Sequence, residues 1–262
     1  MIKPFHAQLI NQSIMIAFGL LCSFGIIKLQ SLQLKQLSQT NLNQESYLSQ
    51  EKREAIQLSF FNKMPSFGFD NLIADWTMLR FLQYFGDGKA RKQTGYSLSP
   101  DFLEVIVKRD PLFARAYLII SPASSMFAGR PERTIELMEK GLEKLSPNIP
   151  DAHYVWLYKG ADEILFIDDL KKAQRSYEMS ADWAKAAGHK KIFHSSNKTA
   201  KFLATNPDIS TAQVSAWFMV WVNNKDKITR ELAQTNIEKL GGKLKIYPDG
   251  RVEAIPPQAI NL

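Results

Sequence analysis

The stretch Gly129-Arg-Pro-Glu-Arg-Thr-Ile-Glu-Leu-Met-Glu-Lys-Gly-Leu-Glu-Lys-Leu-Ser-Pro147 carries the clearest sign of how this chain folds. It opens on a Gly-Arg-Pro turn, continues with small or apolar residues at four-residue steps, and closes on Ser-Pro, which is typical of one complete helix. Residues of the same kind recur 39 positions later. The matching positions are Thr134, Met138 and Leu142, and then Ala173, Tyr177 and Ala181. This repetition predicts two helices that each pack closely on a partner helix.

Each copy of the repeat consists of a helix, a short turn, a second helix and a helix-ending residue. The first copy runs from Pro111 to Pro147 and the second from Pro150 to Gly188. A less regular third pair is expected at Lys190 to Leu203 and Ser210 to Val222, and a last helix at Ile228 to Leu240, before a Gly-Gly pair. The order predicts antiparallel helix hairpins stacked in series.

Two further segments flank these repeats. Upstream, apolar residues at three- and four-residue steps predict a helix with one apolar face, followed by a loop at Gly86 to Ser99 and a helix that opens on Ser99-Pro100. The residues of that face are Leu72, Ile73, Trp76, Leu79, Leu82 and Phe85. Downstream, alternation from Leu244 to Ile255 around Pro248-Asp-Gly250 predicts a short β-hairpin against the last helices.

The quoted stretch resembles the second half of a tetratricopeptide repeat (TPR), with Gly129 at its turn and the small Thr134 and Gly141 at close-packing positions. The second copy adds Trp156 and Gly160. Two departures are a proline at Ser121-Pro122, which should kink the first helix, and an offset that exceeds the usual TPR period of about 34 residues. The resemblance implies an all-α, degenerate TPR-like stack of antiparallel helix pairs, an alpha-solenoid.

The amino-terminal segment Ala7 to Ile27 contains no charged side chain. At ~1.5 Å per residue it would reach about 31 Å as a helix, roughly the thickness of one hydrocarbon core. Residues 1–28 are therefore predicted to form an uncleaved single-pass transmembrane helix, with the helical domain leaning to the non-cytoplasmic side. A cleaved secretory signal and a buried core helix are the alternatives, although no Ala-x-Ala site follows the segment.

The remaining boundaries follow from shifts in composition. Residues 29–65 are rich in Gln, Ser, Asn and Leu and are predicted to form a polar stalk. A TPR-like helical domain is expected at 66–240 and a tail with the short hairpin at 241–262. With its anchor and the run Phe67 to Trp76, the chain is also similar to uncharacterised anchored TPR proteins of cyanobacteria, a resemblance that implies no reaction, cofactor or catalytic residue.

Composition limits the possible chemistry. The chain has 33 Lys and Arg against 26 Asp and Glu, a net charge of +7, and 45% apolar residues, which predicts a basic surface around a sizeable core. The only cysteine, Cys22, lies in the apolar segment. The rest of the chain thus lacks a thiol for a disulfide, a zinc site or a nucleophile.

Patterns that support catalysis are weak. His189 and His194 miss the i, i+4 spacing of a two-histidine metal site, and Gly86 to Lys89 does not match a phosphate-binding loop. Asp75 and the pair Asp162-Glu163 are of a kind that usually bonds a neighbour in helical repeats, although paired acids and bases are an alternative. The sequence predicts no catalytic residue, no metal site, no cofactor and no enzyme activity.

Stacked helix pairs form a concave wall from their first helices, and such walls hold extended or helical peptides. The expected wall consists of Ala116, Tyr117, Ile120, Tyr154, Leu157, Tyr158 and, for acidic groups, Lys159. The chain is therefore predicted to be a membrane-anchored scaffold or adaptor for protein or peptide clients. These clients are expected to be membrane-associated, with assembly or stabilisation of a membrane complex as the process and no nucleic acid involved.

Two other functions stay open. The first is an envelope enzyme or enzyme subunit. The second is a peripheral module that contacts anionic lipid through a basic helix, because the segment His189 to Lys201 accounts for much of the positive charge. The second alternative requires the lysines of this basic patch to share one face of the helix. These lysines are Lys190, Lys191, Lys198 and Lys201.

Overall fold

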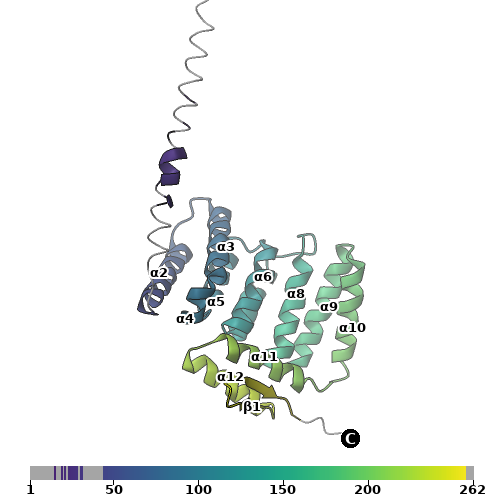
Figure 1. The fold of residues 1–262 in the computed structure, drawn as a ribbon. Coiled ribbons are helices and arrows are strands. Elements are labelled where there is room, and N and C mark those ends of the chain that lie inside the picture. Colours follow the sequence, from purple (N-terminus) through teal and green to yellow (C-terminus); the bar gives the residue numbers. More distant parts are fainter. Residues whose placement is uncertain are drawn as a thin grey trace, which may run out of the picture. The chain divides into compact units, whose positions relative to one another are not determined.

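The computed structural model describes Met15, Gly19, Leu21 and residues 23–28, 30–31 and 44–257. The chain divides into two units, Met1–Ser46 and Tyr47–Leu262 (Figure 1). The described residues of the first unit are helical. None of the helices in the described part of the chain combines the length and the apolar composition that a bilayer crossing requires. Most of the predicted anchor, Ala7 to Ile27, lies outside the described residues.

Residues 44–257 are mostly helical and end in a two-stranded antiparallel sheet. The elements are α2 (Gln44–Lys63), α3 (Asp70–Gly86), α4 (Gly88–Thr94), α5 (Ser99–Arg109), α6 (Ala114–Pro122), η1 (Ala123–Phe127), α7 (Pro131–Leu142), α8 (Ala152–Asp162), η2 (Glu163–Ile167), α9 (Leu170–Ala186), α10 (Lys190–Leu203), α11 (Ser210–Asn223), α12 (Lys227–Lys239), β1 (Lys243–Ile246) and β2 (Val252–Ile255). The prediction of a mainly helical chain with a carboxyl-terminal hairpin is confirmed.

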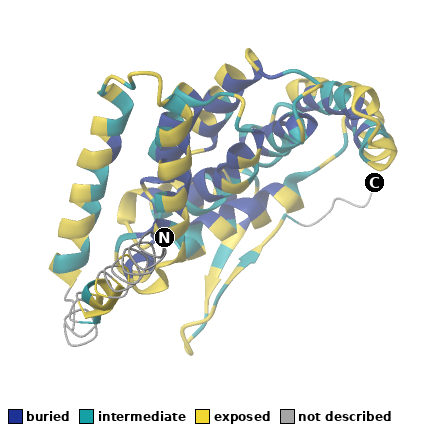
Figure 2. Ribbon diagram, turned by 90° about the horizontal axis from the view of Figure 1, so that it is seen from above, coloured by how far each residue is buried: buried dark blue, intermediate teal, exposed yellow. Residues whose placement is uncertain are grey.

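Neighbouring helices of the second unit pack largely in sequence order (Figure 1). Helix α5 contacts α3, α6 and α7, and α8 contacts α6 and α7. Helix α9 then packs on α8, and α10 packs on α9. Helix α11 contacts both η1 and η2, and with α12 and the hairpin it lies across one end of this row. The buried residues lie on the inward faces of the helices (Figure 2).

The first helix of both copies ends in a short π-helix, η1 after α6 and η2 after α8. A left-handed residue then turns the chain into the second helix, Gly129 with φ 66° and Asp168 with φ 59°. These residues stand 39 positions apart, the same offset as the packing positions in the sequence. Pro122, which was expected to kink the first copy, occupies the last position of α6 directly before η1. The two copies thus share local backbone geometry as well as sequence.

Helix α11 and Asn224, the residue that follows it, contact both π-helices through side-chain amides. Asn224 Nδ2 donates to the carbonyl of Phe127 at 2.6 Å, and Gln213 Nε2 donates to the carbonyl of Ile164 at 3.0 Å. A π-helix leaves carbonyls without their regular i+4 partners, and buried carbonyls need a donor. Gln213 of α11 supplies a donor in one copy, and Asn224, directly after α11, supplies one in the other.

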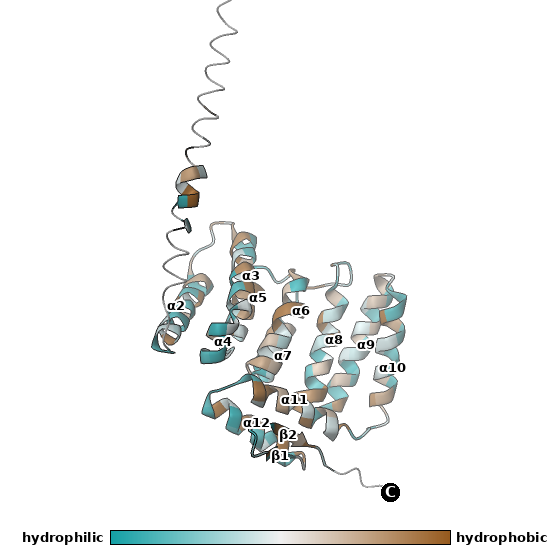
Figure 3. Cartoon of the chain, in the orientation of Figure 1, coloured by the Kyte–Doolittle hydropathy of each residue, from teal (hydrophilic) through white to brown (hydrophobic). Residues whose placement is uncertain are grey.

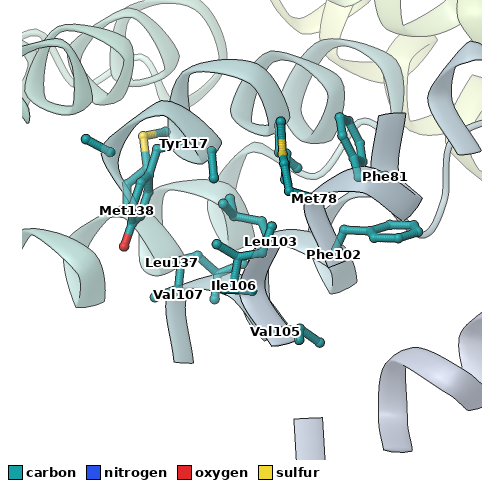
Figure 4. Packing of buried hydrophobic residues seen from close by; sticks show 14 of the residues in the cluster. Met78, Phe81, Phe102, Leu103, Val105, Ile106, Val107, Tyr117, Leu137 and Met138 are labelled. Carbon is teal, nitrogen blue, oxygen red and sulfur yellow. The ribbon is translucent and has the colours of Figure 1, made fainter. Parts of the chain in front are cut away.

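The main core lies among α3, α5, α6 and α7, where Phe81 and Phe102 pack edge to face with their ring centroids 5.6 Å apart (Figure 4). The small positions predicted for the second helices are buried, with Thr134, Ala173 and Ala181 all inside. A second cluster joins η2, α11 and α12 around Trp217. The prediction that Trp217 to Trp221 serves packing agrees with this cluster.

The predicted polar stalk at 29–65 is too long, because α2 belongs to the folded structure. Leu58 is buried in the main core, Glu54 forms an ion pair with Arg80 of α3, and Arg109 of α5 donates to the carbonyl of Phe61 at 3.0 Å. The loop predicted at Gly86 to Ser99 is also corrected, since it contains α4. These helices have few buried apolar residues, so periodicity did not reveal them.

Candidate functional site

The outer face of α3 carries a stripe of large apolar side chains that contact solvent. Leu72, Trp76, Leu79 and Leu82 are 64%, 53%, 55% and 48% exposed. Their spacing of four, three and three residues follows one side of a helix, and Figure 3 shows hydrophobic segments along α3. Large contiguous patches of exposed apolar side chains on folded proteins often mark contact sites for another protein, a membrane or a ligand. We call these four residues the α3 stripe.

The α3 stripe is exposed to solvent because the opposite side of α3 packs against the core. Ala74, Met78, Phe81 and Tyr84 are buried, and the Phe81 and Tyr84 rings pack on Phe102 of α5 with centroids 5.6 and 5.1 Å away. Helix α3 is therefore apolar on two sides, and the aromatic side faces the core. The apolar face predicted from sequence is mainly the solvent face; within it, Ile73 and Phe85 are only partly buried against the core.

Three stripe residues border a shallow hollow. Trp76, Leu79 and Leu82 line it with Arg80 and Gln83, and its volume is about 350 Å³. Arg80 is held by its ion pair with Glu54 of α2. The hollow thus has an apolar floor and a fixed polar edge, as protein-binding surfaces commonly do.

Further exposed apolar residues precede the stripe in the sequence. Phe67 and Phe69 in the α2–α3 turn and Ile56 and Phe60 of α2 are all exposed. Phe67 also has a left-handed backbone, with φ 51°, which is uncommon for a bulky residue. Asp75 is exposed next to Trp76 and places a carboxylate beside the stripe.

The groove predicted on the first helices needs correction. Ala116, Tyr117 and Ile120 are completely buried, because α5 and α8 both pack on α6. The Tyr117 hydroxyl donates to the carbonyl of Pro111 at 3.0 Å, and its ring lies directly against Gly141 of α7. These side chains pack in the core and do not form a solvent-accessible groove.

The part of the predicted groove on α8 is also occupied by internal contacts. Tyr154, Leu157 and Tyr158 are half-buried, and Tyr158 packs against the main core. Lys159, predicted to receive acidic groups of a client, is buried and pairs with Glu163 and, at 3.3 Å, with Glu139. Its charge is therefore satisfied within the chain.

The carboxylates Asp162 and Glu163 are both buried and have separate hydrogen-bond partners. Asp162 accepts from the Ser125 hydroxyl at 2.5 Å, and burial raises the pKa of Asp162 to about 8. Glu163 accepts from Lys159 and, at 2.6 Å, from the Ser176 hydroxyl. The Asp162 contact links α8 to η1, and the Glu163 contacts link η2 to α8 and α9. Both sets of bonds stabilise the packing around α8.

A polar cleft of about 480 Å³ lies among α2, α3 and α4. Its buried Arg91 guanidinium stacks 3.6 Å from the centroid of the Tyr84 ring and lies 3.8 Å from a Glu51 oxygen. Burial raises the pKa of Tyr84, whose hydroxyl accepts from the backbone N–H of Leu98 at 3.2 Å. The acidic and basic groups of the cleft balance, and they tie α2 and α4 to α3.

His153 of α8 and His189, the residue before α10, lie close together. The His153 and His189 rings lie 4.7 Å apart between centroids, and buried His153 has no partner for its Nε2 within the described residues. Burial, and then the neighbouring His189, lower the pKa of His153. Sequence spacing missed this pair because the two residues come from separate elements. Among the described residues no group of three or more His, Cys, Asp or Glu can hold a metal ion.

We expect the contribution of His153 to the stability of the folded unit to be lost as the pH falls below about 6.5, the ordinary histidine pKa. A lowered folded-state pKa means that the unfolded chain binds more protons in this window, so stability is complete above it and declines below it. Thermal unfolding of the full chain and of His153→Phe between neutral and mildly acidic pH checks this. As the pH falls, the stability of His153→Phe should decrease less, or increase more, than that of the parent, while exposed His194→Gln should follow the parent. Equal slopes for all three proteins would refute the expectation.

The basic patch lies on α10. Lys190, Lys191, Lys198 and Lys201 are all exposed. Three of them recur at helical spacing along one side of α10, and Lys191 borders that side. The condition set for a lipid-contacting helix is therefore met.

No protein-family model, curated protein or solved structure matches this chain. Its function is accordingly inferred from the geometry of the described residues.

Proposed function

We propose that this chain is a protein-binding scaffold whose docking surface is the α3 stripe. The observation that carries the proposal is the exposure of Leu72, Trp76, Leu79 and Leu82 on a helix whose other side is fully packed. The segment Ala7 to Ile27 is proposed to tether the scaffold at a membrane. Tethering raises the effective concentration of membrane-bound clients, which supports a role in assembling or stabilising a membrane complex.

The occupant that fits best is an amphipathic helix of a partner protein. Side chains at steps of three and four residues interlock with a second helix that carries apolar residues at the same spacing. Trp76 beside the hollow has the character of a binding hot spot, because a large aromatic ring at an interface gains much contact area. Asp75 favours a basic residue on the partner and disfavours an anionic lipid surface.

A TPR-like stack of helix pairs is part of the proposal. It is supported by the repetition of a left-handed turn residue and a small packing residue after 39 positions, and of a π-helix after 40. In such a stack, α3 belongs to the pair that precedes the two best copies. Binding is thus assigned to the outside of α3 and not to the packed first helices α6 and α8.

Site-specific photo-cross-linking tests the proposal. A photoreactive phenylalanine analogue replaces Leu79 in the full chain, produced in its native cells, and the adducts are identified by mass spectrometry. We expect an adduct with a helical segment of another protein. The same analogue at Glu132, an exposed position of α7, is the matched control and should not form that adduct. Adducts only with residues 7–27 of the same chain, with a second copy, or with lipid would contradict a partner-protein site.

A further inference from the structure

Helix α10 has an unusual distribution of charge. It contains four lysines and His194 but no acidic residue and no arginine. At 3.6 residues per turn, Lys190, His194, Lys198 and Lys201 fall within an arc of about 80°. All four side chains are exposed. We call these residues, with the adjoining Lys191, the α10 face.

The position of α10 leaves this face open. Helix α10 packs chiefly on α9 at the end of the row (Figure 1), and its buried residues Ser196, Ala200 and Leu203 make that contact. Ser196 and Ser180 of α9 share a hydrogen bond at 3.1 Å. The lysines point away from these residues by helical spacing, so neutralising them would not disturb the packing of α10.

The charge of the α10 face is not balanced within the folded unit. No acidic side chain among residues 44–257 forms an ion pair with Lys190, Lys191, Lys198 or Lys201. Lys185 of α9 adds another cation nearby, since its Nζ lies 5.8 Å from the centroid of the Phe193 ring on α10. Clustered unpaired cations repel one another, and an anionic surface relieves that repulsion.

Several features favour a lipid surface over other anions. Lysine is a compact point charge suited to a diffuse negative potential, whereas arginine predominates where phosphate or carboxylate is bound bidentately. The lysines follow the convex side of one helix and not a groove lined by aromatic rings, as single-stranded nucleic acid needs. Phe202 is 55% exposed beside Lys201 and offers an apolar side chain for the boundary between headgroups and acyl chains.

From these observations we infer that the α10 face docks on an anionic phospholipid surface. The inference rests on α10 alone and is independent of the α3 stripe, so either proposal can fail without the other. It adds a second membrane contact to any tether at residues 7–27. Two weak contacts on one membrane bind far more tightly than either alone.

The test measures partitioning of the full chain onto vesicles of phosphatidylcholine alone and of phosphatidylcholine with phosphatidylserine. We compare the ratio of the partition coefficient on the anionic vesicles to that on the neutral vesicles. Binding through the apolar amino-terminal segment does not depend on lipid charge, so its contribution cancels in this ratio. In the α10 variant, Lys190, Lys191, Lys198 and Lys201 become glutamine. Each lysine near an anionic surface contributes about a fivefold increase in partitioning, which gives up to roughly 600-fold for four lysines. We expect the ratio to fall by at least roughly 30-fold, the contribution of two of them.

A matched control removes the same charge elsewhere, through glutamine at Lys89, Lys92, Lys225 and Lys239, all exposed. The control should lower the ratio far less than the α10 variant, and both variants should keep the helical circular dichroism of the parent. An equal fall in both variants would reduce the effect to net charge and overturn the inference. An unchanged ratio in the α10 variant would also overturn the inference. The same holds if the α10 variant loses binding to polyglutamate or polyuridylate but still binds vesicles.

Discussion

Replacing Lys159 with methionine should destabilise the folded unit by about 3–5 kcal/mol, the usual effect of leaving one member of a buried ion pair without its partner. The Lys159 ammonium is buried and bonds Glu163, of which only 1% is exposed. Methionine keeps most of the apolar stem, so packing changes little and the loss reports the unpaired carboxylate. Ser176 supplies a hydrogen bond to Glu163 but no charge.

The double variant Lys159→Met with Glu163→Gln separates charge from packing. It should recover much of the lost stability, because no unpaired charge then remains inside. Lys140→Met removes an i, i+4 partner of Glu136 on the surface and should have little effect. Urea unfolding of the full chain measures all three free energies of unfolding. A Lys159→Met loss no larger than that of Lys140→Met would show that the buried pair does not stabilise the folded unit.

Helix boundaries were predictable where glycine or proline residues end or begin a helix. The predicted helix at Lys190 to Leu203 coincides with α10, because Gly188 ends the preceding helix in a left-handed conformation and Pro207 lies in the connection that follows. The turn at Gly129-Arg130-Pro131 lies where the sequence places it for the same reason. Glycine and proline restrict the backbone itself, so their effect does not depend on tertiary contacts.

The side of a helix that faces the core was harder to predict. On α3 large apolar residues occur on two sides, and the buried side is the one with Ala74, Thr77, Met78, Phe81 and Tyr84. That side is buried because α5 packs there with Phe102. A helix with apolar residues on two sides has no single hydrophobic direction. Only the neighbouring helix decides which side is buried, and a single sequence does not specify that neighbour.

The predicted groove was wrong at Ala116, Tyr117 and Ile120 for a related reason. Their position on a first helix suggested a concave wall, but Gly141 has no side chain and lets the Tyr117 ring lie against α7. A side chain at that position would meet the tyrosine ring, so the small residue marks the place where an aromatic residue enters the core. A small residue in the second helix, opposite an aromatic residue of the first helix, therefore indicates tight packing between the two helices and not an open surface.

Binding to the α3 stripe should depend most strongly on Trp76. Alanine at an aromatic hot spot usually costs about 2–4 kcal/mol of binding free energy, which corresponds to a roughly 30- to 1,000-fold weaker affinity. The indole is 53% exposed and does not belong to the main core, so its removal should leave the fold intact. Phe202→Ala is the matched control, because Phe202 is 55% exposed on α10 and lies away from α3 in the chain.

The decisive measurement is the dissociation constant between the full chain and the partner protein that cross-links at position 79. We expect Trp76→Ala to raise this constant at least about 30-fold, while Phe202→Ala leaves it unchanged and both variants keep the parent's melting temperature. A folded Trp76→Ala protein that binds this partner as tightly as the parent would contradict the assignment of the α3 stripe as the docking surface.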